Sequence, residues 1–288
     1  GAYPVAQTDG AFLAAYAAVD AGAKTVRIRP KDGKGRLFIA ELRVLGEGDT
    51  PGWVQQWQAP LEKADLLALA AHPDDETLGA GATIRKLMEN GHRVAVCIMA
   101  ASAGARANLS DTLQADEEAA LALLGVSRVY RADFPNIKMN TTPHLELVQF
   151  IEKAIADFSA EAIITHHPSD TNNDHAMTSQ AAQAAARLFQ RREGVPPLRL
   201  LLYMEVPSST EWSLDASVRR FAPNYFVEVG QEGVTRKLEA LAKYKGVMRP
   251  YPHPRSREAI GGLAAFRGAQ AGCNYAEAFE CVYQRADV

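Results

Sequence analysis

Histidine and carboxylate side chains gather in the stretch His-Pro-Asp-Asp-Glu at residues 72–76, and an Asp-His pair follows much later, at residues 174–175. An imidazole and a carboxylate are good ligands for a divalent metal ion, and a second carboxylate beside them is free to act as a base. Three protein ligands and one open position are the usual arrangement of a catalytic zinc site. We therefore predict a metal site formed by His72, Asp75 and His175.

Each of these stretches follows an apolar run, at residues 65–70 in the first case and 162–165 in the second. Such runs are typical of buried strands, and side chains at the carboxyl ends of strands in an α/β sheet face a ligand crevice. Taken alone, the first stretch also fits a plain strand-to-helix turn in which Asp74 or Asp75 caps the helix. Its combination with the second stretch favours the metal site.

The elements that must position these residues follow from residue 64 onward, where strand and helix patterns alternate. Apolar runs predict strands and spaced apolar residues predict helices. We expect strands at 65–70, 93–99, 128–130, 162–165, 198–204 and 225–229, and helices at 112–124, 143–158, 174–190 and 233–246. Such alternation predicts an α/β fold: a Rossmann-like, doubly wound, mainly parallel sheet with helices on both faces.

The first 60 residues read differently from the rest. Residues 25–29 and 38–44 alternate between apolar and polar side chains on either side of a Gly-rich turn, which predicts a hairpin. A module of this size with few strands is marginal by itself. We expect a small β-rich segment at residues 1–60 and a separate catalytic domain at 61–288.

Composition narrows the possible partners. The net charge is −3 without a basic block, which argues against a nucleic-acid surface. No apolar run approaches the roughly 18 residues of a membrane span, and no signal peptide is visible. The cysteines Cys97, Cys273 and Cys281 form no paired motif, so we expect no disulfide framework. These features suit a cytoplasmic protein with a small-molecule substrate, and a homo-oligomer is compatible with them.

The intact sequence Ala-His-Pro-Asp-Asp-Glu at residues 71–76, with Asp-His at 174–175 after a strand, resembles the PIG-L/LmbE-like metal-dependent de-N-acetylases. The segments at 205–212 and 252–256 are similar to one branch of that family. The resemblance covers about residues 64–288. It implies zinc-dependent hydrolysis of the N-acetyl group of an amino sugar, in an N-acetylglucosamine-type glycoconjugate or a nucleotide sugar, with release of acetate.

The resemblance also implies roles for individual residues. The metal ligands of the family match His72, Asp75 and His175, and its general base matches Asp74. Zinc is the expected ion, with another divalent metal such as Fe²⁺ as the alternative. Asp174 is expected to support a ligand or the oxyanion.

The chain departs from the family pattern at Asn172, where many members have a histidine. An amide can still hydrogen-bond an oxyanion, but it carries no positive charge. We predict that His253 takes over this catalytic role and that Arg255 lies nearby to bind substrate oxygens. Arg106, in the loop after the second strand, is a further candidate for substrate contact.

For several residues near these motifs, a structural role is expected rather than a catalytic one. Glu76 is expected to brace the turn or to add negative charge at a helix start. One of His166 and His167 is expected to line the pocket, and the sequence does not say which. Trp212 is expected to be a packing anchor, although a sugar could stack on it.

Two other functions compete with deacetylation of a sugar. The chain could be an amidase for a larger amide, such as a thiol or antibiotic conjugate, or a carbohydrate-binding protein with a vestigial metal site. A dinucleotide-binding site fits less well, because the acidic stretch occupies the place where the glycine-rich turn should follow the strand. Close packing of a helix on the sheet explains Gly79 and Gly81 better.

Overall fold

The computed structural model describes residues 64–102 and 112–285. The elements in chain order are β1 (Leu66–Ala70), α2 (Asp75–Glu89), β2 (Val94–Ile98), α3 (Leu113–Leu124), β3 (Arg128–Arg131), η2 (Met139–Thr141), α4 (His144–Phe158), β4 (Ala162–His166), α5 (Asn173–Ala185), η3 (Leu188–Gln190), β5 (Leu200–Met204), η4 (Thr210–Trp212), β6 (Tyr225–Glu228), α6 (Gly230–Leu241), α7 (Arg257–Ala271) and β7 (Ala276–Gln284). The predicted β-rich segment at 1–60, and with it the division at residue 60, lies outside the described residues and stays a prediction.

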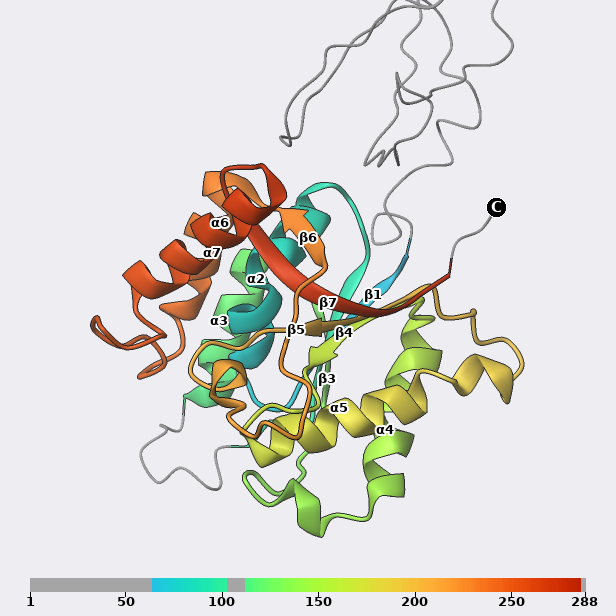
Figure 1. The fold of residues 1–288 in the computed structure, drawn as a ribbon. Helices are drawn as coiled ribbons and strands as arrows, with labels where there is room; N and C mark the ends of the chain where they lie inside the picture. The colour runs from blue at the N-terminus through green and yellow to red at the C-terminus, as the bar shows by residue number, and fades with distance from the viewer. Residues whose placement is uncertain (1–63, 103–111, 286–288) are drawn as a thin grey trace, which may run out of the picture. The chain divides into compact units, whose positions relative to one another are not determined.

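One seven-stranded sheet organises the described region, in the order β3-β2-β1-β4-β5-β7-β6 (Figure 1). The five strands from β3 to β5 are parallel to one another, whereas β7 runs antiparallel to both β5 and β6. The chain order reverses between β1 and β4, and such a switch point is where ligands bind in open α/β sheets. The predicted doubly wound, mainly parallel fold is confirmed.

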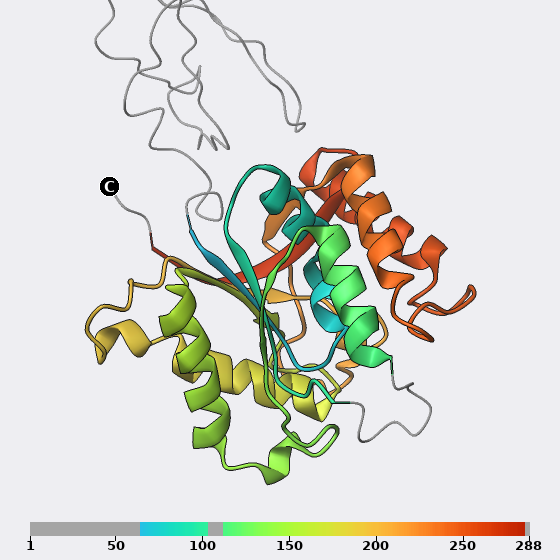
Figure 2. The same cartoon turned by 180° about the vertical axis from the view of Figure 1, so that it is seen from behind.

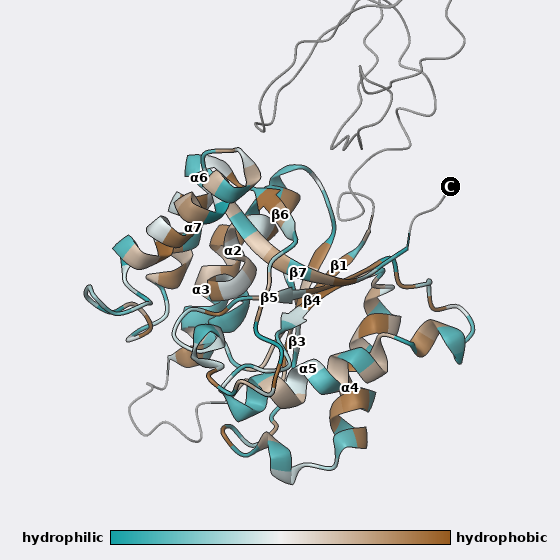
Figure 3. Ribbon diagram, in the orientation of Figure 1, coloured by the Kyte–Doolittle hydropathy of each residue, from teal (hydrophilic) through white to brown (hydrophobic). Residues whose placement is uncertain are grey.

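Helices cover both faces of the sheet (Figures 1 and 2). The helices α2, α3, α6 and α7 pack on one face, and α4 and α5 on the other. Strand β1 shows why both faces are apolar: Leu66 and Ala68 join the first core, and Leu67 and Leu69 the second. Apolar colour accordingly runs along the central strands in Figure 3. A strand buried on both sides reads as a continuous apolar run, as the sequence suggested.

The predicted helix at 174–190 is shorter than expected. Helix α5 ends at Ala185, and a separate 3-10 turn, η3, follows at Leu188–Gln190. No helix within the described ranges, 64–102 and 112–285, has both the length and the apolarity to cross a bilayer.

Candidate active site

The turn between β1 and α2 places the first group of candidate residues. Asp74 occupies the position before the helix, with φ of 112°, a left-handed conformation that is uncommon for residues other than glycine. Its side chain makes no capping hydrogen bond to the helix. The plain capping interpretation is therefore wrong for Asp74, and its carboxylate is directed elsewhere.

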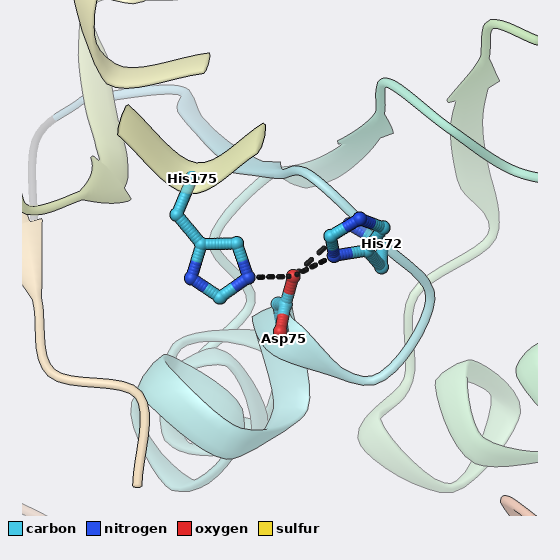
Figure 4. A group of neighbouring side chains, drawn as sticks. All are labelled: His72, Asp75 and His175. Carbon is cyan, nitrogen blue, oxygen red and sulfur yellow. Dashed lines mark hydrogen bonds and ion pairs between the residues drawn. The ribbon is translucent and has the colours of Figure 1, made fainter. Parts of the chain in front are cut away.

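His72, Asp75 and His175 meet at the ends of β1 and α5 (Figure 4). Asp75 Oδ2 lies 3.2 Å from His72 Nδ1 and 3.1 Å from His175 Nε2. All three residues are buried, and one ligand atom from each falls within 4.8 Å of the others. The donors are two imidazoles and one carboxylate, the set that zinc and similar ions accept. The fold thus gathers the predicted ligands, and metal ligation itself stays a prediction.

A second carboxylate orients each of the two imidazoles. Asp174 Oδ2 lies 3.0 Å from His72 Nε2, and Asp170 Oδ1 lies 3.2 Å from His175 Nδ1. Histidines that bind metals commonly donate their other ring N–H to such a carboxylate, which fixes the tautomer. His72 Nδ1 and His175 Nε2 are therefore the nitrogens left free to face a metal ion beside Asp75.

Asp174 is itself held firmly at the start of α5. Its carboxylate accepts the backbone N–H groups of Ile137 at 2.6 Å and Met139 at 3.0 Å. Burial favours a raised pKa for Asp174, but the hydrogen bonds from His72, Met139 and Ile137 outweigh burial and lower it. An ionised Asp174 suits the predicted support of a ligand.

Asp170 is held by the segment after β5. Thr210 Oγ1 donates to Asp170 Oδ2 at 2.7 Å, and Ser209 Oγ donates to Asp170 Oδ1. Ser209 Oγ also lies 3.2 Å from His175 Nδ1. Burial favours a raised pKa for Asp170, but His175, followed by His166 and the Ser209 hydrogen bond, outweighs burial and lowers this pKa to about 2. Sequence reasoning missed Ser209 and Thr210, although the polar run after a strand end was a usable signal.

His166, Asp170 and His175 form another group of nearby ligand atoms. The His166 and His175 rings stack with centroids 3.9 Å apart at an angle of 24°. Two stacked imidazole rings point their nitrogen lone pairs in nearly the same direction. The ligands of one tetrahedral metal ion must instead converge on it from different directions, so His166 and His175 are a poor pair of ligands for a single ion. In addition, His166 Nε2 already accepts the Ala71 N–H at 2.8 Å. Burial lowers the pKa of His166 to about 3. Its imidazole is therefore neutral at physiological pH, and it lines the site without adding charge.

His167 faces away from this group. Its Nε2 lies 3.5 Å from Glu280, and its ring meets Tyr203 and Phe221 edge-on. Of the two histidines left open by the sequence, His166 is therefore the one at the site.

Arg255 reaches the carboxylate of Asp74. Its Nη1 lies 3.2 Å from Asp74 Oδ2, and its Nε donates to Ser208 Oγ at 2.7 Å. We expected this guanidinium near the substrate oxygens; the structure places it on the residue predicted to be the general base. The pairing joins positions 181 residues apart in sequence.

The remaining predicted site residues have other surroundings. His253 is exposed, and its Nδ1 accepts the Arg255 N–H at 3.0 Å; its described contacts do not bring it to the His72–Asp75–His175 group. Asn172 caps α5, because its Oδ1 accepts the Asp174 N–H at 3.0 Å. Arg106 lies outside the described residues. The roles predicted for these three side chains stay predictions.

Trp212 does not act as a packing anchor, because it is 57% exposed. It belongs to η4, where it directly follows Thr210 and Glu211 on the segment that holds Asp170. The apolar environment that a packing anchor needs is missing there.

Residues 67–186 match the model of the GlcNAc-PI de-N-acetylase family, PIG-L, and the matched range contains the three candidate ligands and Asp74. Over this range the chain is similar to the PIG-L family. The uncharacterized deacetylase YaiS of Escherichia coli strain K12 is 28% identical over 192 residues, which cover 64% of this chain and 92% of YaiS. Both matches support a deacetylase, that is, a hydrolase.

Solved structures share the fold of this chain. N,N'-diacetylchitobiose deacetylase from Pyrococcus horikoshii superposes with a TM-score of 0.63 at 21% identity, covering 77% of this chain and 85% of that one. The 4-carboxy-2-hydroxymuconate hydratase GalB from Pseudomonas putida reaches 0.62 at 19% identity, covering 77% and 98%. Because a deacetylase and a hydratase share the architecture, the fold alone does not select the reaction.

Proposed function

We propose that this PIG-L domain removes the N-acetyl group of an amino sugar and that a divalent metal ion, preferably zinc, takes part. The observation that carries the proposal is the arrangement of two neighbouring carboxylates. Asp75 lies within the three-ligand group, while Asp74 lies beside Arg255. His72, Asp75 and His175 would hold the ion. Such an ion polarises the acetyl carbonyl and lowers the pKa of bound water.

Asp74 is the proposed general base. It takes a proton from the attacking water as the water oxygen bonds to the acetyl carbon, and it delivers that proton to the sugar nitrogen as the carbon–nitrogen bond breaks. The products are acetate and a free amine. Arg255 keeps the Asp74 carboxylate in one orientation, and a fixed geometry is a large part of catalytic rate.

The developing oxyanion needs a donor besides the metal ion. We keep His253 and Asn172 as the proposed candidates, and Arg106 as the proposed contact for substrate oxygens. His253 would have to turn inward from its exposed position, and Asn172 would have to release its cap on α5. Neither change is needed for the proton transfers by Asp74.

The substrate class proposed is an N-acetylglucosamine-type glycoconjugate or a nucleotide sugar. A deacetylase of a diacetylated disaccharide shares the fold, which supports an acetamido sugar as the substrate. Zinc is our choice of ion because the donor set is two nitrogens and one oxygen; Fe²⁺ accepts the same donors.

A screen for acetate release tests this function. The full chain, loaded separately with Zn²⁺ and Fe²⁺, is incubated with N-acetylhexosamine glycosides and nucleotide sugars, and acetate and free amine are measured. We expect equal amounts of both products from at least one substrate, and loss of activity after chelation. Hydrolysis of a larger amide with no reaction on any acetamido sugar would favour the amidase, and binding without any release would favour the carbohydrate-binding protein.

A further inference from the structure

The strained backbone of Asp74 has a dedicated hydrogen-bond partner. Its φ of 112° is unfavourable for a residue with a side chain, and such strain persists only where the surroundings enforce it. The Asp74 N–H donates to Glu76 Oε2 at 3.1 Å. The side chain of Glu76 therefore holds the backbone of Asp74 in place.

Glu76 is a fully buried carboxyl group held by neutral donors. Thr77 Oγ1 donates to Glu76 Oε1 at 2.6 Å, and the Tyr244 hydroxyl donates to the same oxygen at 2.7 Å. Among the described residues, no Lys, Arg or His forms an ion pair with Glu76. A buried carboxyl without a counter-ion is unfavourable for folding, so its presence calls for a reason other than stability.

Tyr244 connects this carboxyl to a distant part of the chain. It lies beyond the end of α6, is 2% exposed, and is 168 residues away from Glu76 in sequence. Its ring packs within the core on the α2 face of the sheet. A hydroxyl anchored in a packed core gives Glu76 a fixed location.

We propose that Glu76 and Tyr244 are positioning residues that hold the Asp74 backbone in its left-handed conformation. The inference rests on the proposed function, because it concerns the base of that reaction. With the backbone so held, the carboxylate of Asp74 points to Arg255 while that of Asp75 points to the histidines. In a relaxed turn the two carboxylates lose this separation, and a displacement of about 1 Å can lower a rate roughly a hundredfold.

The chemistry requires an acceptor for the Asp74 N–H rather than a charge. Glutamine at position 76 keeps an acceptor oxygen, and its amide group can donate to the Tyr244 hydroxyl. Leucine removes the acceptor. Combining Glu76→Leu with Tyr244→Phe removes both members of that hydrogen bond, while the Asp74 N–H loses Glu76 as its acceptor, so the melting temperature is expected to fall.

The test compares the double variant Glu76→Leu/Tyr244→Phe with Glu76→Gln in the full chain. Metal content, melting temperature, kcat and KM are measured on a substrate from the acetate screen. We expect the double variant to fold and keep its metal but to lose kcat by roughly 10- to 100-fold, with KM nearly unchanged. Glu76→Gln should keep kcat within about fivefold of the wild type. Glu117→Gln, at another buried carboxyl, is the matched control and should leave kcat unchanged.

A double variant with wild-type kcat would overturn the inference, as would a Glu76→Gln variant as slow as the double variant. If the double variant does not fold, Tyr244→Phe alone decides: a severalfold loss of kcat with normal metal content supports the inference, and an unchanged kcat overturns it. Asp74→Asn separates this outcome from failure of the proposed function. If Asp74→Asn is inactive while the double variant is fully active, only the positioning role is wrong; if Asp74→Asn is fully active, the proposed function fails.

Discussion

Two carboxylates that are neighbours in sequence, Asp74 and Asp75, have different partners in the structure. Asp75 contacts two imidazoles, and Asp74 contacts a guanidinium. The difference arises from the left-handed backbone of Asp74, which turns its side chain away from the start of α2. At the scale of single residues, the proposed roles of Asp75 as metal ligand and Asp74 as base therefore depend on one backbone torsion.

Arg255 provides a direct test of how the base is held. Arg255→Gln should lower kcat by roughly 10- to 100-fold, because the Asp74 carboxylate loses the guanidinium that orients it. Arg255→Lys should not restore the rate, since an ammonium group cannot reach Asp74 and Ser208 with the planar fork of a guanidinium. Steady-state kinetics on both variants measure this. If Arg255→Lys were as fast as the wild type, a positive charge alone would be enough to hold Asp74, and the guanidinium geometry would not matter.

Asp170 tests the orientation of the ligand histidine. Asp170→Asn should weaken metal binding by roughly 10- to 100-fold, because His175 loses the carboxylate that fixes its tautomer. A competition titration with a chromogenic chelator gives the affinity. Asp215→Asn, at an acidic residue whose hydrogen bonds to described residues stay within its own loop, is the control. Equal affinities for the wild type and Asp170→Asn would contradict this role.

At the scale of elements, the sequence predicted local features better than distant ones. The strand-end position of residues 72–76 followed from the adjoining apolar run, and the predicted β1 is confirmed. The Arg255–Asp74 and Tyr244–Glu76 contacts join positions 181 and 168 residues apart. The spacing of residues along the sequence does not predict contacts between such distant positions.

The C-terminal pair α7 and β7 was not predicted. Gly261, Gly262 and Gly268 weaken the helical pattern of α7, and Gly268 is required because an added Cβ would lie 2.6 Å from the Asn274 carbonyl oxygen. Strand β7 is buried only over its first half, so it shows neither a continuous apolar run nor a regular alternation.

Gly79 tests the packing of α2 against the sheet. A Cβ at this position would lie 2.4 Å from Met204 Sδ and 3.0 Å from Met204 Cβ, so Gly79→Ala forces the Met204 side chain or α2 to shift. We expect a loss of about 1–3 kcal/mol in the free energy of unfolding, measured by urea denaturation. Gly91→Ala, at a turn with open space around it but a φ of 78°, separates backbone strain from crowding. Unchanged stability of Gly79→Ala would contradict close packing here.

At the scale of the whole molecule, the candidate site is built within the region that the structure describes, apart from Arg106. Residues from β1, α2, α5 and the segments after β5 and α6 supply it. All seven strands of the sheet belong to the same region. We therefore propose that the deacetylase reaction belongs to residues 61–288.

A chain that begins at residue 61 tests this assignment. We expect it to fold cooperatively and to keep the wild-type kcat on a small acetamido sugar, because it retains the sheet, the candidate ligands and Asp74. Thermal unfolding and acetate release measure the two properties. A truncated chain that folds and binds metal but has lost its activity would show that residues 1–60 contribute to the reaction.

The central claim, that Asp74 moves the proton beside a metal held by His72, Asp75 and His175, is tested most directly by one paired measurement. Bound metal per chain and the rate of acetate release are determined on the same preparations of wild type and Asp74→Asn. The account predicts equal metal content and a rate at least about a hundredfold lower in the variant. Acetate release at the wild-type rate by a metal-loaded Asp74→Asn protein would contradict it.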